Sequence, residues 1–226
     1  MANKLFDPRH GKSFNQGFRA RRFEFFKSLL KKIDQGKPIK ILDVGGTQIY
    51  WERMDFSGHD NVFITLLNLD LAPVSNANFS SIKGDACNLS EFEDDHFDIV
   101  FSNSVIEHLF TLENQQKMAN EVRRVGKNYY VQSPNFYFPI EPHWLFPFFQ
   151  FFPFGMRVWL TRNFNLGHYT KSTSKADAVL RVKEVQLLTE KQMRSLFPDG
   201  DVYRERFFGL KKSITMYSFK GEINRG

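Results

Sequence analysis

The chain has 226 residues, enough for a single domain spanning residues 1–226. Charged residues make up 25% and the mean hydropathy is −0.41, which excludes a polytopic membrane protein. The formal net charge of +6 is too small to indicate a nucleic-acid partner by itself. Cys87 is the single cysteine and the N-terminus lacks the apolar core of a signal peptide, so we expect the mature protein to begin there and to be cytoplasmic.

An amphipathic pattern in the N-terminal segment, residues 1–37, predicts a helix from about Phe14 to Ile33. Phe23, Phe26, Leu30 and Ile33 share one face of this helix. Basic residues occupy most of the other positions: Arg19, Arg21, Arg22, Lys27, Lys31 and Lys32. These charges form either a solvated face or a patch for acidic lipid headgroups or an anionic substrate.

Apolar, β-rich runs then recur at crossover-length intervals, which indicates a parallel sheet covered by helices on both faces. Between the fourth and fifth runs the pattern predicts a helix over Glu113–Val125, and Thr189 begins a later helix with a capping box. Two final strands, joined by the short link Gly209–Lys212, are expected to pair antiparallel. The seven expected strands are Ile39–Val44, Val62–Leu69, Phe79–Lys83, Phe97–Ser102, Tyr129–Gln132, Asp201–Phe208 and Ser213–Phe219.

Polar and glycine residues follow four of these strands, at the sheet edge where open α/β folds bind ligands. Asp43 precedes Gly45-Gly46, where a ligand could approach the backbone. Asp70 follows the second strand and could accept both hydroxyls of a ribose, and Asp85-Ala86 could frame an adenine. Each of these stretches could also be an ordinary turn, but four of them in this order are unlikely to arise by chance.

The stretches ILDVGG (41–46), LNLDLAP (67–73), GDA (84–86) and FDIVFSNSVIEHL (97–109) together resemble the class I S-adenosylmethionine-dependent methyltransferases. The resemblance runs from about residue 38 to 220. It implies a Rossmann-like, mostly parallel seven-stranded α/β sheet and S-adenosyl-L-methionine as cofactor. Thr47 and Ile49 stand where the family has glycines, and the short segment Leu71–Asn78 leaves little room for the family's usual helix.

Carried over to this sequence, the resemblance assigns cofactor contacts to residues at the strand ends. Asp43, Gly45 and Gly46 would lie by the methionine part of the cofactor. Either Asp70 or Asn68 would hold the ribose, and we favour Asp70 because a charged acceptor suits paired hydroxyls. The remaining contacts are the adenine frame, Asp85 and Ala86, and the floor near the reactive centre, Asn103.

A hydroxyl acceptor would also need a general base. The candidates are His143 and Glu141, which follow the fifth strand, and His108, which follows the fourth. Imidazole titrates near neutral pH, which suits this role. Either histidine could instead make only a structural hydrogen bond or cap a helix.

The insertion from residue 136 to 188 contains a Phe-rich stretch, Trp144–Leu160. Pro147, Pro153 and Arg157 make it a poor membrane span, so we expect a lid over an apolar or lipid-linked acceptor, or packing against the sheet edge. With the basic helix it could give peripheral membrane contact.

The six histidines are scattered, with no H-x₃₋₅-H or C-x₂-C spacing, so the sequence predicts no metal site. The leading hypothesis is methyl transfer to a small or lipid-linked acceptor, at oxygen. The alternative is a cofactor-binding or membrane-peripheral protein without transfer activity, and the missing glycine fingerprint disfavours a nicotinamide-dependent oxidoreductase.

Overall fold

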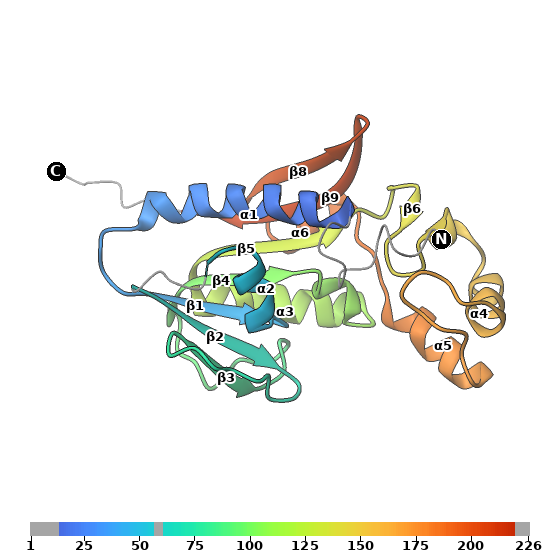
Figure 1. Ribbon diagram of the computed structural model, residues 1–226, viewed down its shortest axis with the longest axis horizontal. Coiled ribbons are helices and arrows are strands. Elements are labelled where there is room, and N and C mark those ends of the chain that lie inside the picture. Colours follow the sequence, from blue (N-terminus) through green and yellow to red (C-terminus); the bar gives the residue numbers. More distant parts are fainter. Residues whose placement is uncertain (1–13, 57–60, 220–226) are drawn as a thin grey trace.

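The computed structural model describes residues 14–56 and 61–219, so the expected start of the mature protein lies outside the described residues. Seven strands form one sheet in the spatial order β3-β2-β1-β4-β5-β9-β8 (Figure 1). The pairs among β1 to β5 are parallel, and β9 runs antiparallel to both β5 and β8. The strands are β1 (Ile39–Val44), β2 (Val62–Asn68), β3 (Phe79–Lys83), β4 (Phe97–Asn103), β5 (Gly126–Pro134), β8 (Asp201–Phe207) and β9 (Leu210–Ser218). The predicted Rossmann-like α/β sheet with an antiparallel C-terminal pair is confirmed.

β5 and the last hairpin differ most from the sequence prediction, whereas the other strand bounds differ by at most one residue. β5 begins at Gly126, where a side chain would lie 2.6 Å from Cγ2 of Val100, so helix and strand can follow each other directly only with glycine. The predicted link Gly209–Lys212 is wrong. The last hairpin turns at Phe208-Gly209, both with positive φ (46° and 79°), because the glycine permits a two-residue turn.

Helices cover both faces of the sheet, because successive strand residues point to opposite sides (Figure 1). Ile41 packs in a cluster with residues of α1 and α2, whereas Leu42 packs in a second cluster with residues of α3 and α6. The predicted capping box at Thr189 is confirmed at the start of α6. The four helices are α1 (Phe14–Ile33), α2 (Gln48–Arg53), α3 (Leu112–Val125) and α6 (Glu190–Leu196).

The α1 helix has the predicted bounds, and its residues Phe23, Phe26 and Leu30 are buried against the sheet. Arg22 is a correction, because we expected it on the solvated or ligand-binding face. It is 7% exposed, and its Nη1 lies 2.8 Å from Oε2 of Glu205 on β8. A buried guanidinium needs such a carboxylate partner, so Arg22 joins α1 to the last hairpin.

The chain between β2 and β3 contains no helix in the described residues 69–78, as the short segment predicted. The connection instead stays close to the strand ends. The backbone N–H of Ala72 donates to Oγ of Ser81 at 2.8 Å, and that of Gly84 donates to the carbonyl of Asn68 at 2.9 Å. The ends of β2 and β3 are therefore tied together at the edge where ligands bind in such sheets.

The insertion after β5 folds into a unit with its own small core, beyond the carboxyl ends of the strands (Figure 1). Its two ends meet, because the N–H of Phe136 donates to the carbonyl of Leu188 at 3.0 Å. Trp144 and Phe149 stack in the core with ring centroids 4.4 Å apart. The elements are β6 (Ile140–Glu141), β7 (Phe146–Pro147), a 3₁₀ turn (Phe149–Phe151), α4 (Phe154–Asn163) and α5 (Lys175–Glu184).

Within residues 14–56 and 61–219, no helix combines the length and the apolar character needed to cross a bilayer. The Phe-rich stretch divides among β7, the 3₁₀ turn and α4, and α4 has only 10 residues. This agrees with the expectation that the stretch does not span a membrane.

Candidate active site

The carboxyl ends of β1, β2, β4 and β5 share one edge of the sheet, and this parallel register brings the predicted site residues together. Val44 pairs with Leu67 on one side and with Ser102 on the other. Asn103 pairs with Gln132 of β5. The loops that follow these strands therefore open onto a common site.

The loop after β1 requires its two glycines. Gly45 has φ of 74°, and a side chain there would lie 2.5 Å from Cγ2 of Val105. A side chain at Gly46 would collide with the carboxylate of Asp43. The missing family glycines at 47 and 49 are accommodated because α2 begins at Gln48, directly after an extended Thr47. This glycine loop, called the glycine cradle below, therefore requires glycine at two positions only, Gly45 and Gly46.

Asp43 lies beneath this cradle and is 1% exposed. Trp51 of α2 donates its indole N–H to Oδ2 of Asp43 at 2.7 Å. Burial raises the pKa of Asp43 to about 7, and the Trp51 hydrogen bond only partly offsets this effect. The carboxylate therefore supports the loop from inside the protein rather than standing in the open cleft.

Asn68 and Asp70 differ in what they have left to offer a ligand. Asn68 donates its Nδ2 to the carbonyl of Gly46 at 3.0 Å, which fixes the glycine loop. Asp70 is exposed, and among the described residues its carboxylate pairs with Nζ of the exposed Lys83 at 3.4 Å. Large exposed apolar side chains lie along the same edge, a signal that sequence reasoning missed: Ile49, Leu69 and Leu71.

Asp85 begins a turn, as one reading of the sequence suggested, because its Oδ1 accepts from the N–H of Cys87 at 2.9 Å. Ala86 is buried beside this turn. Asn103 is half-buried at the end of β4, and the next residue, Ser104, is held by Gln132 through its backbone and its hydroxyl. The structure thus brings the predicted contacts to one edge of the sheet.

The two predicted histidines meet although they are 35 residues apart. Nε2 of His143 lies 3.2 Å from Nε2 of His108, and the rings are nearly perpendicular. His108 ends a 3₁₀ turn (Ile106–His108) after β4, and His143 follows β6 in the insertion. The strand ends and the insertion therefore build this pair jointly.

Glu141 holds His143 in place. It is 1% exposed, its Oε1 lies 2.7 Å from Nδ1 of His143, and its Oε2 accepts from the backbone N–H groups of His143 and Trp144, each at 2.7 Å. Burial alone would lower the pKa of His143, but the Glu141 charge and hydrogen bond outweigh burial, so the pKa is raised. Burial, with some repulsion from His143, lowers the pKa of His108 to about 4.

Glu107 is a further member of the cluster, to which sequence reasoning gave no role although it stands in the motif before His108. It is fully buried, and neither carboxylate oxygen makes a hydrogen bond of normal geometry among the described residues. Burial raises its pKa to about 7, although His143 and the nearby Ser133 hydroxyl favour the charged form. On the other side, Oε1 of Glu184 lies 3.3 Å from Nδ1 of His108.

Comparison with known proteins agrees with this geometry. Residues 42–129 match the family model described as "Methyltransferase domain". This match covers β1 through the beginning of β5, and it includes the glycine loop, Asp70, Asp85 and His108. Over these residues the chain is similar to a methyltransferase domain, and its sheet has the fold of the class I enzymes. The family and the fold together imply S-adenosylmethionine as the cofactor of this domain.

Solved structures show the same fold at low sequence identity. A SAM-dependent methyltransferase from Methanosarcina mazei is 15% identical with a TM-score of 0.53, and the match covers 84% of this chain and 94% of that one. A putative O-methyltransferase from Nostoc punctiforme is 14% identical with a TM-score of 0.51, covering 88% and 56%. At these identities the likeness establishes the fold of the methyltransferase domain alone.

Among curated proteins, two uncharacterized proteins of Mycobacterium tuberculosis, from strains CDC 1551 and H37Rv, are each 34% identical over 64 residues. The matched segment is 28% of this chain. It is 22% of each relative, so the chain matches only about a fifth of their length.

Proposed function

We propose that this methyltransferase domain transfers a methyl group from S-adenosylmethionine to an oxygen of an apolar or lipid-linked acceptor. One observation carries the proposal: a histidine–carboxylate cluster lies at the same sheet edge as the glycine cradle. A cofactor site and a proton-accepting site on one edge are what methyl transfer to a hydroxyl requires.

The residues at the strand ends fit the cofactor. Gly45 and Gly46 have no room for a side chain because Val105 and Asp43 pack against them, so this loop keeps a bare backbone beside the strand ends. Asp70 has an exposed carboxylate for the ribose hydroxyls, whereas the amide of Asn68 is used to hold Gly46. We assign the ribose to Asp70, the adenine to Asp85 and Ala86, and the floor of the site to Asn103.

S-adenosylmethionine supplies a methyl group on a positively charged sulfur, already activated for in-line displacement. The chain must therefore orient the acceptor, exclude water and take up the acceptor's proton. Glu141 accepts from Nδ1 of His143, which leaves the lone pair on Nε2 of His143, beside Nε2 of His108. We assign the proton-accepting role to Nε2 of His143, with Glu141 as its positioning residue.

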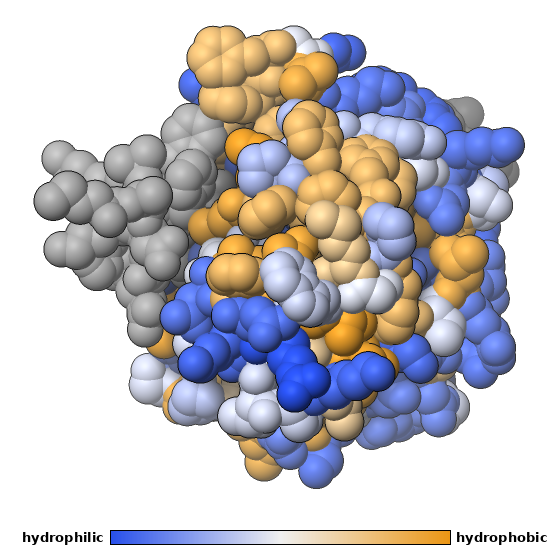
Figure 2. All heavy atoms as spheres, turned by 90° about the vertical axis from the view of Figure 1, so that its right-hand side faces the viewer, coloured by the Kyte–Doolittle hydropathy of each residue, from blue (hydrophilic) through white to orange (hydrophobic). Residues whose placement is uncertain are grey.

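The insertion supports an apolar acceptor, as Figure 2 shows for the face that it forms together with neighbouring elements. Hydrophobic side chains gather there, with charged groups around them. Large exposed apolar residues of the insertion are Tyr137, Ile140, Phe148, Phe151, Phe154, Met156, Trp159 and Phe164. A cluster of exposed large apolar side chains is typical of a binding surface rather than of a solvated face.

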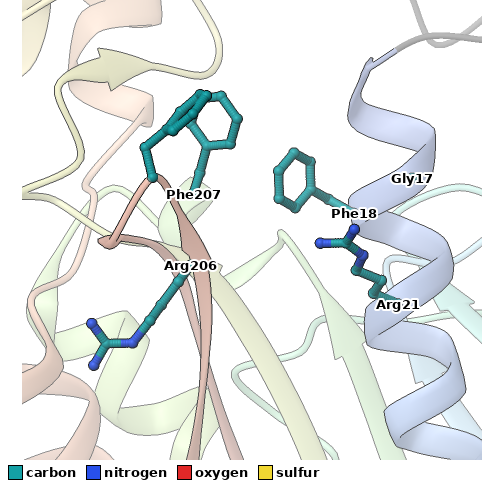
Figure 3. Close-up of a pocket in the computed structure, with 6 residues that line it drawn as sticks. Gly17, Phe18, Arg21, Arg206 and Phe207 are labelled. Carbon is teal, nitrogen blue, oxygen red and sulfur yellow. The ribbon is translucent and has the colours of Figure 1, made fainter.

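A hollow of about 380 Å³ adjoins this face, between α1 and the β8–β9 turn (Figure 3). Phe18 and Phe207 both line it and pack edge to face, with ring centroids 5.7 Å apart, and Arg21 lies beside Phe18. Phe207 also approaches Phe138 of the insertion, with ring centroids 6.5 Å apart. Aromatic walls beside arginines suit an acceptor or membrane lipid with an acidic headgroup, so we include peripheral membrane contact in the proposal.

The test is methyl transfer from labelled cofactor to two acceptor pools, a total lipid extract in vesicles and a water-soluble metabolite extract. We expect label in the lipid pool, in an alkali-stable methyl ether or an alkali-labile methyl ester, and about 10²–10⁴-fold slower labelling by His143→Ala. Label only in the water-soluble pool would refute the lipid-linked acceptor. The absence of transfer to either pool, by protein that binds the cofactor, would refute the enzymatic proposal.

A further inference from the structure

We infer that Glu107, His108 and His143 form a binding site for one divalent transition-metal ion of the zinc type. Each of the three offers one ligand atom, and these atoms lie within 4.8 Å of one another. Two residues come from the turn after β4 and one from the insertion. Their positions in the sequence do not match the short spacings of known metal-binding motifs.

The histidine geometry matches two ligands of one ion. Zinc–nitrogen bonds of about 2.0–2.1 Å at a tetrahedral angle place two ligand nitrogens about 3.3 Å apart. Nε2 of His108 and Nε2 of His143 are 3.2 Å apart. The two rings are nearly perpendicular, with centroids 4.8 Å apart.

The surroundings orient these ligands as in metal sites, where the second nitrogen of a ligand histidine donates to a carboxylate. Oε1 of Glu141 lies 2.7 Å from Nδ1 of His143, and two backbone N–H groups fix Oε2 of Glu141. Oε1 of Glu184 lies 3.3 Å from Nδ1 of His108, close enough to complete such a bond after a small rotation. Nε2 of His143 is thereby left as the lone-pair donor.

Glu107 is the independent observation that points to a ligand. Its side chain is 0% exposed, and both oxygens are without a hydrogen bond of normal geometry in the part of the chain that the structure describes. A buried carboxylate whose oxygens lack hydrogen bonds of normal geometry is costly, and a cation bound to one oxygen would compensate it. Two imidazoles and one carboxylate are the ligand set of open zinc and related transition-metal sites, whereas magnesium and calcium prefer oxygen ligands.

The cluster is open on one side, because the side chain of His108 is 29% exposed. An ion there can take an acceptor oxygen as a further ligand and lower the pKa of that hydroxyl, which then loses its proton to solvent before it attacks the methyl group. This role rests on the proposed methyl transfer, whereas metal binding itself does not.

The test is zinc binding to chelator-treated full-length protein, measured by competition with a chromophoric chelator, and the absorption spectrum after addition of Co²⁺. We expect one ion per chain, a Co²⁺ spectrum of a four- or five-coordinate nitrogen–oxygen site, and at least 10-fold weaker binding by both Glu107→Gln and His108→Ala. Glu141→Gln should weaken binding about 10–100-fold through its effect on His143. His96→Ala, which changes an exposed histidine outside the cluster, should bind like the wild type.

No stoichiometric zinc binding by the wild type, or undiminished binding by folded His108→Ala, would overturn the inference. Circular dichroism of each variant identifies any that fail to fold. His108 is partly exposed, so His108→Ala should disturb folding less than a change at the fully buried Glu107. Methyl transfer measured with and without chelator separates the two proposals. Zinc binding without methyl transfer would refute only the proposed function, and transfer without zinc binding would refute only the metal site.

Discussion

The buried carboxylate of Glu141 and the imidazole of His143 are joined at 2.7 Å, two residues apart on a segment that Pro142 stiffens. The same carboxylate also accepts two backbone N–H groups, so its position is fixed by the insertion rather than by the histidine. This arrangement makes Glu141 the positioning residue and His143 the residue that faces the cluster.

The Glu141–His143 pair predicts a graded loss of methyl transfer. His143→Ala should lower turnover by about 10²–10⁴-fold, because the proton acceptor or metal ligand is lost. Glu141→Gln should lower it by about 10–100-fold, because the ring remains but its orientation and charge partner change. S-adenosylhomocysteine affinity should stay near the wild-type value in both variants, since the nucleoside contacts lie on other strands. Glu113→Gln, which changes an exposed carboxylate on α3, serves as the control. Normal turnover in His143→Ala would contradict this assignment.

The glycine cradle predicts a specific effect on folding stability. Gly46→Ala forces a side chain against the Asp43 carboxylate, so the free energy of unfolding should fall by about 1–3 kcal/mol. Gly155→Ala is the matched control, because nothing lies within 4 Å of a side chain there and the residue is in helix α4. It should leave stability unchanged within about 0.5 kcal/mol or raise it slightly. Urea unfolding of both variants checks the prediction, and equal stability of the two would show that the cradle is not as close as described.

Asp43 predicts a pH dependence of stability. Burial raises its folded-state pKa from 3.8 to about 7, so the folded protein holds this proton more tightly than the unfolded chain. The stabilising effect of the proton is complete below about pH 4 and is lost as the pH rises through 7. Asp43→Asn keeps an acceptor for the indole of Trp51 but removes the titration. The difference in unfolding free energy between wild type and Asp43→Asn should therefore shift against the wild type from pH 4.5 to 7.5. A pH-independent difference would argue against the buried, raised-pKa carboxylate.

Most of the fold could be predicted from the sequence because the strands are buried, β-rich runs bounded by Gly, Asp or Asn, and helix α1 has a strict apolar period. The bounds of β1, β3 and α1 agree with the prediction to the residue. Local patterns were insufficient where a long-range contact decides the outcome. Arg22 looks like any surface arginine in the sequence, and only the packing of α1 against β8 reveals its partner, Glu205.

The sequence singles out individual candidate residues but not their grouping. Asp70, His108 and His143 stand out because they follow strands, whereas the meeting of the two histidines depends on how the insertion folds back. Glu107 was not assigned a role because its burial, and not its position in the motif, is what distinguishes it. For the same reason, counting short His and Cys spacings could not indicate the metal site proposed above.

The most direct test of the account is calorimetric titration of S-adenosylhomocysteine into the wild-type protein and Asp70→Ala, with Asp94→Ala as an exposed aspartate outside the site. The account predicts one site per chain in the wild type and in Asp94→Ala. It predicts binding weaker by about 1.5–3 kcal/mol in folded Asp70→Ala, the scale of lost hydrogen bonds to a charged group. Absence of binding by the folded wild type would contradict the central claim that this sheet edge holds the cofactor, and equal affinity in Asp70→Ala would contradict the ribose assignment.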